Sequence, residues 1–232
     1  MQSVSIIIPV YNEEATIARL LENLLSITWP IKTEVIVVND GSNDNTKSAL
    51  SAFENRCILK TLPENRGKGY AMRQGVSLAA GEWVAFLDAD LENDPRDFFT
   101  LIEKATQTGA DSVIGSRLLA HSRAQGTSPF FFWGGKLLTL YMNILFSLSL
   151  TDVTSGFRIV RRTSFNELPL SSERFSIEAE LVARQALLGQ KIVEAPISYK
   201  PRSVTEGKKL QLTDGVRAAL FVLSIRLSHL LR

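Results

Sequence analysis

The sequence contains almost no cysteine and no strong excess of charge of either sign. Cys57 is the only cysteine among 232 residues, so neither a disulfide nor a cysteine-rich metal site can form within the chain. The 26 basic and 24 acidic residues leave a net charge of +2, whereas nucleic-acid-binding domains are usually strongly basic. We therefore expect a reducing compartment and no nucleic-acid partner.

The sequence also lacks a signal-peptide core and an uninterrupted membrane-spanning run. The apolar run at residues 6–10 is too short for a signal peptide and follows no basic region, so we expect a cytoplasmic protein. The longest apolar stretch, residues 130–150, is interrupted by Lys136 and Asn143, and a lysine at mid-bilayer costs about 3 kcal/mol on insertion scales. This stretch is expected to form an interfacial membrane helix, with core packing or a true membrane span as alternatives.

Hydrophobic periodicity indicates an α/β protein. A buried strand at residues 3–10 precedes a helical stripe of Ile17, Leu20, Leu21, Leu24 and Leu25. Further strands are predicted at 34–38, 57–62, 83–87 and 111–115, with helices at 46–54 and 70–80 and another beginning near Pro95. Alternating strands and helices predict a mostly parallel, Rossmann-like sheet with helices on both faces.

The chain changes character after residue 117. A polar loop and the apolar stretch 130–150 precede a predicted strand at 156–160, a helix at 176–188 and an extended segment at 192–199. A basic loop and a final amphipathic apolar helix follow. We predict one domain at residues 1–200, with halves of about 1–117 and 118–200, and an appendage at 201–232.

Three carboxylates follow the predicted strand 83–87 at alternate positions: Asp88, Asp90 and Glu92. Ligands of open α/β sheets bind at the carboxyl ends of strands, and alternate residues of an extended segment project to one side. Three adjacent carboxylates would repel one another unless a cation neutralised them, and Mg²⁺ and Mn²⁺ favour oxygen ligands. The pattern predicts a metal site, with a solvated acidic turn as the alternative.

Polar residues at the ends of the other strands can extend this site. Tyr11 could cover a base, Glu13 and Asp40 could accept hydrogen bonds from a base or ribose, and Lys68 could bind phosphate. Each signal is weak alone, since a sequence such as Asp-Gly-Ser at 40–42 is more often a turn and helix cap. Together they predict one ligand-binding rim.

These motifs, at 9–14, 39–44, 65–71 and 88–92, resemble in order and spacing the donor half of family-2 inverting glycosyltransferases with the GT-A fold. Segments 115–117, 152–158 and 199–210 are similar to the branch that contains dolichyl-phosphate mannose synthase and related polyprenyl-phosphate glycosyltransferases. Many members of this branch carry Gln where Glu92 stands. The resemblance implies a GT-A fold, with a donor half at 1–117 and an acceptor half at 118–200.

The resemblance implies that a sugar moves from a nucleotide-sugar donor to a polyprenyl (dolichyl or undecaprenyl) phosphate. It implies a Mg²⁺ or Mn²⁺ cofactor and peripheral attachment to the cytoplasmic face of a membrane. The implied metal ligands are Asp88, Asp90 and Glu92, and the implied catalytic residues are Asp90 and Asp152. The implied donor-binding residues are Pro9, Tyr11, Glu13, Asp40, Lys68 and Asp88. The implied acceptor-binding residues are Arg117, Ser155, Arg158, Arg202 and Lys209.

The need for a general base depends on the acceptor. A phosphate monoester is already a dianion at about pH 7 and needs no base, whereas a hydroxyl does. Asp152 is the main candidate for an acceptor-side carboxylate. Glu178 and Glu180 are alternatives, although their amphipathic helix favours a solvated position. Two other functions remain open: transfer to a soluble or polysaccharide hydroxyl, and nucleotide binding by a non-catalytic regulator. The motifs do not specify the sugar, the nucleotide or the oligomeric state.

Overall fold

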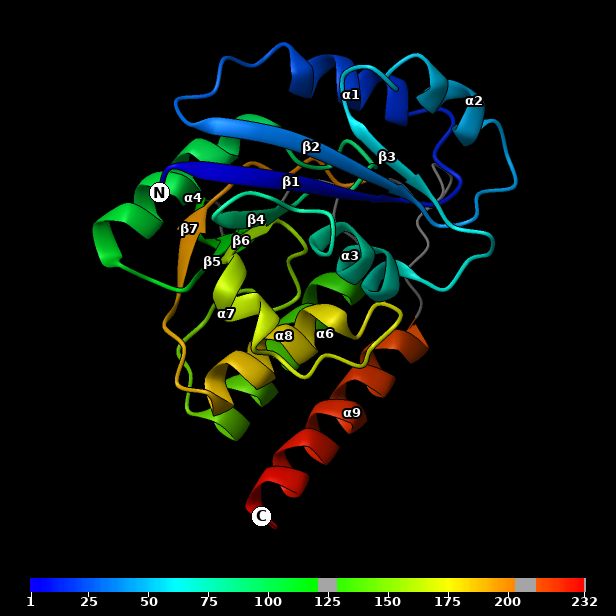
Figure 1. The fold of residues 1–232 in the computed structure, drawn as a ribbon. Coiled ribbons are helices and arrows are strands. Elements are labelled where there is room, and N and C mark those ends of the chain that lie inside the picture. Colours follow the sequence, from blue (N-terminus) through cyan, green and yellow to red (C-terminus); the bar gives the residue numbers. More distant parts are fainter. Residues whose placement is uncertain (121–128, 203–211, 232) are drawn as a thin grey trace.

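The computed structural model describes residues 1–120, 129–202 and 212–231 of the chain, which contain a seven-stranded sheet (Figure 1). The strand order is β3-β2-β1-β4-β6-β5-β7. The strands are β1 (Ser3–Val10), β2 (Lys32–Asn39), β3 (Ile58–Thr61), β4 (Trp83–Phe86), β5 (Ser112–Ser116), β6 (Arg158–Arg161) and β7 (Ile192–Pro196). Only the pairs that include β6 are antiparallel within these ranges. The predicted, mostly parallel sheet is confirmed.

The alternation of side chains along β1 explains why helices cover both faces of the sheet. Ile6 and Ile8 pack into one buried cluster, and Ile7 packs into another. The first cluster includes α1 (Ile17–Leu25), α2 (Thr46–Ser51) and α4 (Phe98–Thr108). The second includes α3 (Lys68–Val76), α7 (Arg162–Asn166) and α8 (Ile177–Leu187). The short helices η1 (Pro95–Asp97) and α5 (Arg117–Ala120) precede α4 and follow β5. The predicted two-sided architecture is confirmed.

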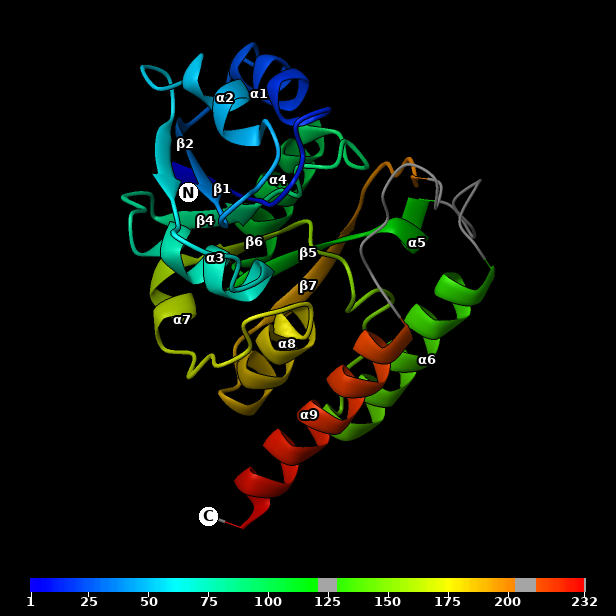
Figure 2. The same ribbon diagram turned by 90° about the vertical axis from the view of Figure 1, so that its right-hand side faces the viewer.

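Helices α6 (Pro129–Phe146) and α9 (Leu212–Leu230) lie side by side in an arm that projects beyond the sheet (Figure 2). Their inner faces form a third buried cluster with α8, in which Met142 of α6 and Val222 and Ile225 of α9 take part. The predicted C-terminal helix is therefore confirmed, and stretch 130–150 contributes to the core through one face only. No helix within the described ranges is long and apolar enough to cross a membrane.

Candidate active site

One cavity of about 980 Å³ opens beyond the carboxyl ends of β1, β2 and β4. It brings together most of the residues singled out from the sequence, from both halves of the chain. The predicted site residues that line it are Pro9, Tyr11, Glu13, Asp40, Lys68, Asp88, Asp90, Glu92, Arg117, Asp152, Ser155 and Arg202. Arg158 does not line the cavity, and Lys209 lies outside the described residues.

Asp40 fixes the loop that leads to Lys68. The Asp40 carboxylate accepts hydrogen bonds from the backbone N–H groups of Arg66 (3.0 Å) and Gly67 (2.7 Å) and from Nδ2 of Asn65 (2.8 Å). Gly67 has a φ of +103°, a conformation that side chains other than hydrogen rarely allow. The buried Asp40 carboxylate thus holds this loop in place while Asp40 also lines the cavity.

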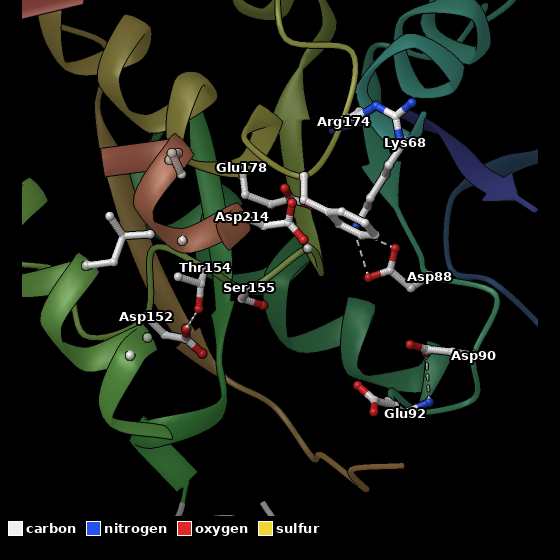
Figure 3. A pocket seen from close by; sticks show the side chains of 18 of the residues that line it. Lys68, Asp88, Asp90, Glu92, Asp152, Thr154, Ser155, Arg174, Glu178 and Asp214 are labelled. Atoms are coloured by element: carbon white, nitrogen blue, oxygen red, sulfur yellow. Dashed lines mark hydrogen bonds and ion pairs between the residues drawn. The ribbon is translucent and has the colours of Figure 1, made fainter. Parts of the chain in front are cut away.

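Lys68 lies between two carboxylates contributed by different halves of the chain. Its Nζ is 2.6 Å from Oδ1 of Asp88 and 2.7 Å from Oε1 of Glu178. Burial by itself would lower the pKa of Lys68, but the negative charges of Asp88 and Glu178 outweigh it and raise this pKa. Lys68 therefore stays charged and joins the end of β4 to the start of α8 (Figure 3).

Asp90 is a buried carboxylate among like charges. Burial, followed by the charges of Asp88 and Glu92, raises the pKa of Asp90 to about 7. Its Oδ1 accepts a hydrogen bond from the backbone N–H of Glu92 (3.1 Å). Such a group is stabilised by a nearby cation, so Asp90, together with Asp88, could supply oxygen ligands to a divalent metal.

The position of Glu92 does not fit the predicted metal triad, because its carboxylate bonds to other parts of the protein. Its carboxylate accepts hydrogen bonds from the Tyr199 hydroxyl (2.8 Å) and the backbone N–H of Arg202 (2.7 Å). Leu91 has a φ of +62°, so the chain turns and the expected strand-like alternation ends there. No group of three metal-binding side chains is found among the residues that the structure describes. Figure 3 shows the Asp88 side chain directed toward Lys68, whereas Asp90 lies beside Glu92.

Arg117 and Asp152 form a two-pronged ion pair. The Nε and Nη2 atoms of Arg117 each lie 2.7 Å from an Asp152 carboxylate oxygen, and Nη2 also donates to Oγ1 of Thr154 (2.8 Å). Burial would raise the pKa of Asp152, but the positive charge of Arg117 dominates and lowers it. A paired carboxylate with a lowered pKa is a poor proton acceptor, which argues against Asp152 as a general base.

Arg158 is a framework residue, contrary to its predicted role in acceptor binding. It is fully buried, and its guanidinium donates to the backbone carbonyls of Ser155, Val153 and Glu178. These bonds attach segment 153–155 to the start of α8. The location follows from the five N–H donors of arginine, which backbone carbonyls can satisfy inside a protein.

Arg202 lines the cavity and bonds to residues that were predicted to bind the donor and the metal. Its Nε donates to the backbone carbonyl of Asp90 (2.6 Å), and its Nη2 is 3.0 Å from Oε2 of Glu13. Arg202 therefore joins the segment after β7 to the loops after β1 and β4.

Glu178 and Glu180 are the main residues whose position the sequence interpretation missed. Both were expected on a solvated face, yet Glu178 is 7% exposed and lines the cavity, and Glu180 is fully buried. The Glu180 carboxylate accepts from the backbone N–H groups of Ser171 and Ser172, which fixes the loop before α8. A signal was present, because apolar residues occur all round this helix: Ile177, Ala179, Leu181, Val182 and Ala183.

Two curated relatives match nearly the whole chain in sequence. Dolichyl-phosphate beta-glucosyltransferase ALG5A of Trichomonas vaginalis is 28% identical over 97% of this chain and 73% of its own length. Low-salt glycan biosynthesis hexosyltransferase Agl6 of Haloferax volcanii is 28% identical over 95% of this chain, which spans only 53% of that relative.

Two solved structures share the fold. Glucosyl-3-phosphoglycerate synthase from Mycobacterium tuberculosis superposes with a TM-score of 0.74 and 20% identity, over 97% of this chain and 79% of that one. Mannosyl-3-phosphoglycerate synthase from Rubrobacter xylanophilus has a TM-score of 0.74 and 17% identity, over 98% and 74% of the two chains. The family model described as "Glycosyl transferase family 2" matches residues 5–169, and the chain therefore belongs to glycosyl transferase family 2.

Proposed function

We propose that this chain transfers a sugar from a nucleotide-sugar donor to a polyprenyl phosphate, with a divalent cation bound at Asp88 and Asp90. The observation that carries the proposal is the lining of the cavity, which includes both the charged residues at the strand ends and a set of apolar residues on α6 and α9, here called the apolar groove. The groove is lined by Leu137, Leu138 and Tyr141 of α6 and by Val216, Ala218 and Ala219 of α9. A single cavity can thus receive a phosphate and the hydrocarbon attached to it.

The donor end contains the groups that a nucleoside diphosphate requires. Tyr11 and Glu13 lie where a nucleoside would enter, and Asp88 and Asp90 would hold Mg²⁺ or Mn²⁺, which stabilises the charge of a diphosphate leaving group. Crystals of the glucosyl-3-phosphoglycerate synthase contain Mn²⁺ and UDP-glucose, which supports a metal and a nucleotide sugar here. Arg202 orients Glu13 and the Asp90 backbone.

Arg117 is the best-placed cation for the acceptor phosphate. Asp152 and Thr154 hold its guanidinium in one orientation, so little conformational entropy remains to be lost when a phosphate binds. A phosphate dianion can attack without a base, which agrees with the poor basicity of Asp152. The dolichyl-phosphate glucosyltransferase relatives also support a lipid-phosphate acceptor.

The outer face of the arm is suited to a membrane surface at the cytoplasmic side. Nine of the fourteen exposed large hydrophobic residues in the described ranges lie on α6, on α9 or directly after it. They are Trp133, Leu137, Leu140, Ile144, Val216, Leu220, Leu227, Leu230 and Leu231. Leu137 and Val216 also line the groove, so the apolar surface continues into the cavity. Such a surface is typical of interfacial helices and gives a lipid acceptor a direct route to the site.

Variants that narrow the groove test the acceptor. A Cβ atom added at Gly134 or Gly215 would meet nothing within 4 Å, so both positions have open space where a larger side chain begins, and the variants are Gly134→Leu and Gly215→Leu. We expect both to slow transfer to a long polyprenyl phosphate by about tenfold or more, and to change transfer to a phosphate with a single isoprene unit much less. Ser224→Leu, at an exposed position of α9 that does not line the groove, is the matched control.

Transfer to a small phosphate-bearing acceptor is a second candidate, because the solved relative is crystallised with phosphoglyceric acid. Phosphoglycerate is therefore included in the same assay. Efficient transfer to phosphoglycerate, together with groove variants that behave like the wild type, would favour the small acceptor over the lipid.

A further inference from the structure

The Lys68–Glu178 ion pair lies between the donor and acceptor ends of the cavity, and the transfer reaction proposed above gives it no role. Segment 154–156 runs from Thr154, which is bonded to Arg117, to Gly156, which lies against Lys68 and Asp88. A Cβ atom on Gly156 would be 2.6 Å from Nζ of Lys68 and 2.7 Å from Oδ2 of Asp88. Lys68 and its second partner, Glu178, therefore lie between the places where the two phosphates are expected (Figure 3).

The transferred sugar must occupy this space, because its anomeric carbon leaves the donor diphosphate and bonds to the acceptor phosphate. A carboxylate in a cavity that receives two phosphates would oppose binding if it faced either of them. Facing a neutral ring, the same carboxylate can accept hydrogen bonds from hydroxyl groups, and a neighbouring ammonium can donate to them. The Glu178–Lys68 pair therefore suits the hydroxyls of a sugar.

The protein holds Glu178 firmly in this position. Glu178 lies in the first turn of α8, where the helix dipole favours a negative charge. Glu180 fixes the loop that precedes the helix through Ser171 and Ser172, and Arg158 donates to the Glu178 carbonyl. These bonds fix the backbone, and burial and the ion pair with Lys68 fix the carboxylate, which is the arrangement needed to distinguish hydroxyl positions.

We propose that Glu178, together with Lys68, forms hydrogen bonds with the hydroxyl groups of the transferred sugar and determines which hexose the enzyme accepts. This proposal rests on the proposed glycosyl transfer and names the selecting residue. An epimer with one misplaced hydroxyl would lose its hydrogen bond to this buried ion pair. Sites that hydrogen-bond a substrate hydroxyl reject analogues lacking it far more strongly than apolar pockets reject a size change.

Binding measurements without an acceptor test the proposal separately from the identity of the acceptor. The full chain with Mn²⁺ is titrated with UDP and GDP alone, with the C4 epimers UDP-glucose and UDP-galactose, and with the C2 epimers GDP-glucose and GDP-mannose. Glu178→Gln is compared with the wild type. Glu173→Gln, which removes an exposed carboxylate from the loop before α8, is the matched control.

We expect Glu178→Gln to weaken binding of the preferred nucleotide sugar by about tenfold or more and to narrow the preference between its epimers. Affinity for the nucleoside diphosphate alone should change less than about threefold. Glu178→Asp retains the charge but shortens the side chain, so it should change the ratio of the affinities for the two epimeric nucleotide sugars. This variant replaces Glu178→Gln if the latter folds poorly.

Three results would overturn the proposal. Equal weakening of nucleotide and nucleotide-sugar binding would mean that Glu178 only supports Lys68 and Asp88. Unchanged binding with unchanged epimer preference would mean that Glu178 does not contact the sugar. Unchanged binding with a collapse of turnover on a hydroxyl acceptor would make Glu178 a general base. A failure of lipid transfer would leave these binding measurements unaffected.

Discussion

Replacement of Asp152 by Asn separates a positioning role from a catalytic one. The substitution keeps the shape of the side chain but removes the charge that holds Arg117 through two contacts of 2.7 Å. Both partners are largely buried, with side-chain exposures of 26% for Arg117 and 5% for Asp152. Removing one partner of a buried pair costs about 3–5 kcal/mol, and an isosteric amide that keeps one acceptor should fall near the lower end.

The kinetic consequence should appear in the use of the acceptor. Arg117 would lose its fixed orientation, so we expect the KM for the acceptor phosphate to rise about tenfold, as for one lost charge-assisted hydrogen bond. Turnover at saturating acceptor should fall less than about tenfold, because a phosphate dianion needs no base, whereas loss of a true base typically costs about 100-fold or more. The measurement is initial rate against acceptor concentration at fixed donor.

The pH dependence of stability supplies an independent check. Because the pKa of Asp152 is lowered in the folded state, its stabilising contribution is complete above the unfolded-state pKa of about 4 and is lost as the pH falls through the folded-state pKa. The difference in unfolding free energy between wild type and Asp152→Asn should therefore be constant near pH 7 and shrink below about pH 4. Abolished turnover with an unchanged acceptor KM would refute this reasoning and identify Asp152 as the base.

Three further predictions concern residues around the same cavity. Asp90→Asn should abolish transfer without lowering the melting temperature, since it removes a buried charge with a raised pKa; most activity surviving in this variant, or in wild type with EDTA, would contradict a metal site there. Glu92→Gln should keep Mn²⁺ affinity within about threefold, because Glu92 bonds to Tyr199 and Arg202; a loss of about 100-fold would restore it as a ligand. Arg158→Ala should destabilise the fold by about 3 kcal/mol or more, measured by denaturant unfolding, because it leaves buried carbonyls unpaired; a stable variant with weak acceptor binding would contradict the framework role.

Local sequence patterns predicted the architecture well because they report local physics. The stripe of Ile17, Leu20, Leu21 and Leu24 is buried as expected, and β1 alternates its side chains between two clusters. Strand ends could be placed for the same reason, so most of the predicted site residues meet in one cavity. Periodicity and position in the chain suffice to identify elements of this kind.

The partners of individual site residues could not be predicted, because they come from distant parts of the chain. Glu92 bonds to Tyr199 and Arg202, which lie 107 and 110 residues further along, and a turn at Leu91 separates it from Asp88. Glu178 is buried because α8 packs among the sheet, α6 and α9. The bonding partners and the burial of such residues depend on tertiary packing, which no local sequence pattern specifies.

The most direct test of the central claim is the fate of a labelled sugar. The purified protein is incubated with Mn²⁺, labelled nucleotide sugars and vesicles that contain a polyprenyl phosphate, and the products are partitioned between organic solvent and water. Sugar transfer to the lipid phosphate predicts label in the organic phase that depends on Mn²⁺, on the polyprenyl phosphate and on Asp90. Label that appears only in water-soluble products, or in none with any donor, would contradict the proposed acceptor.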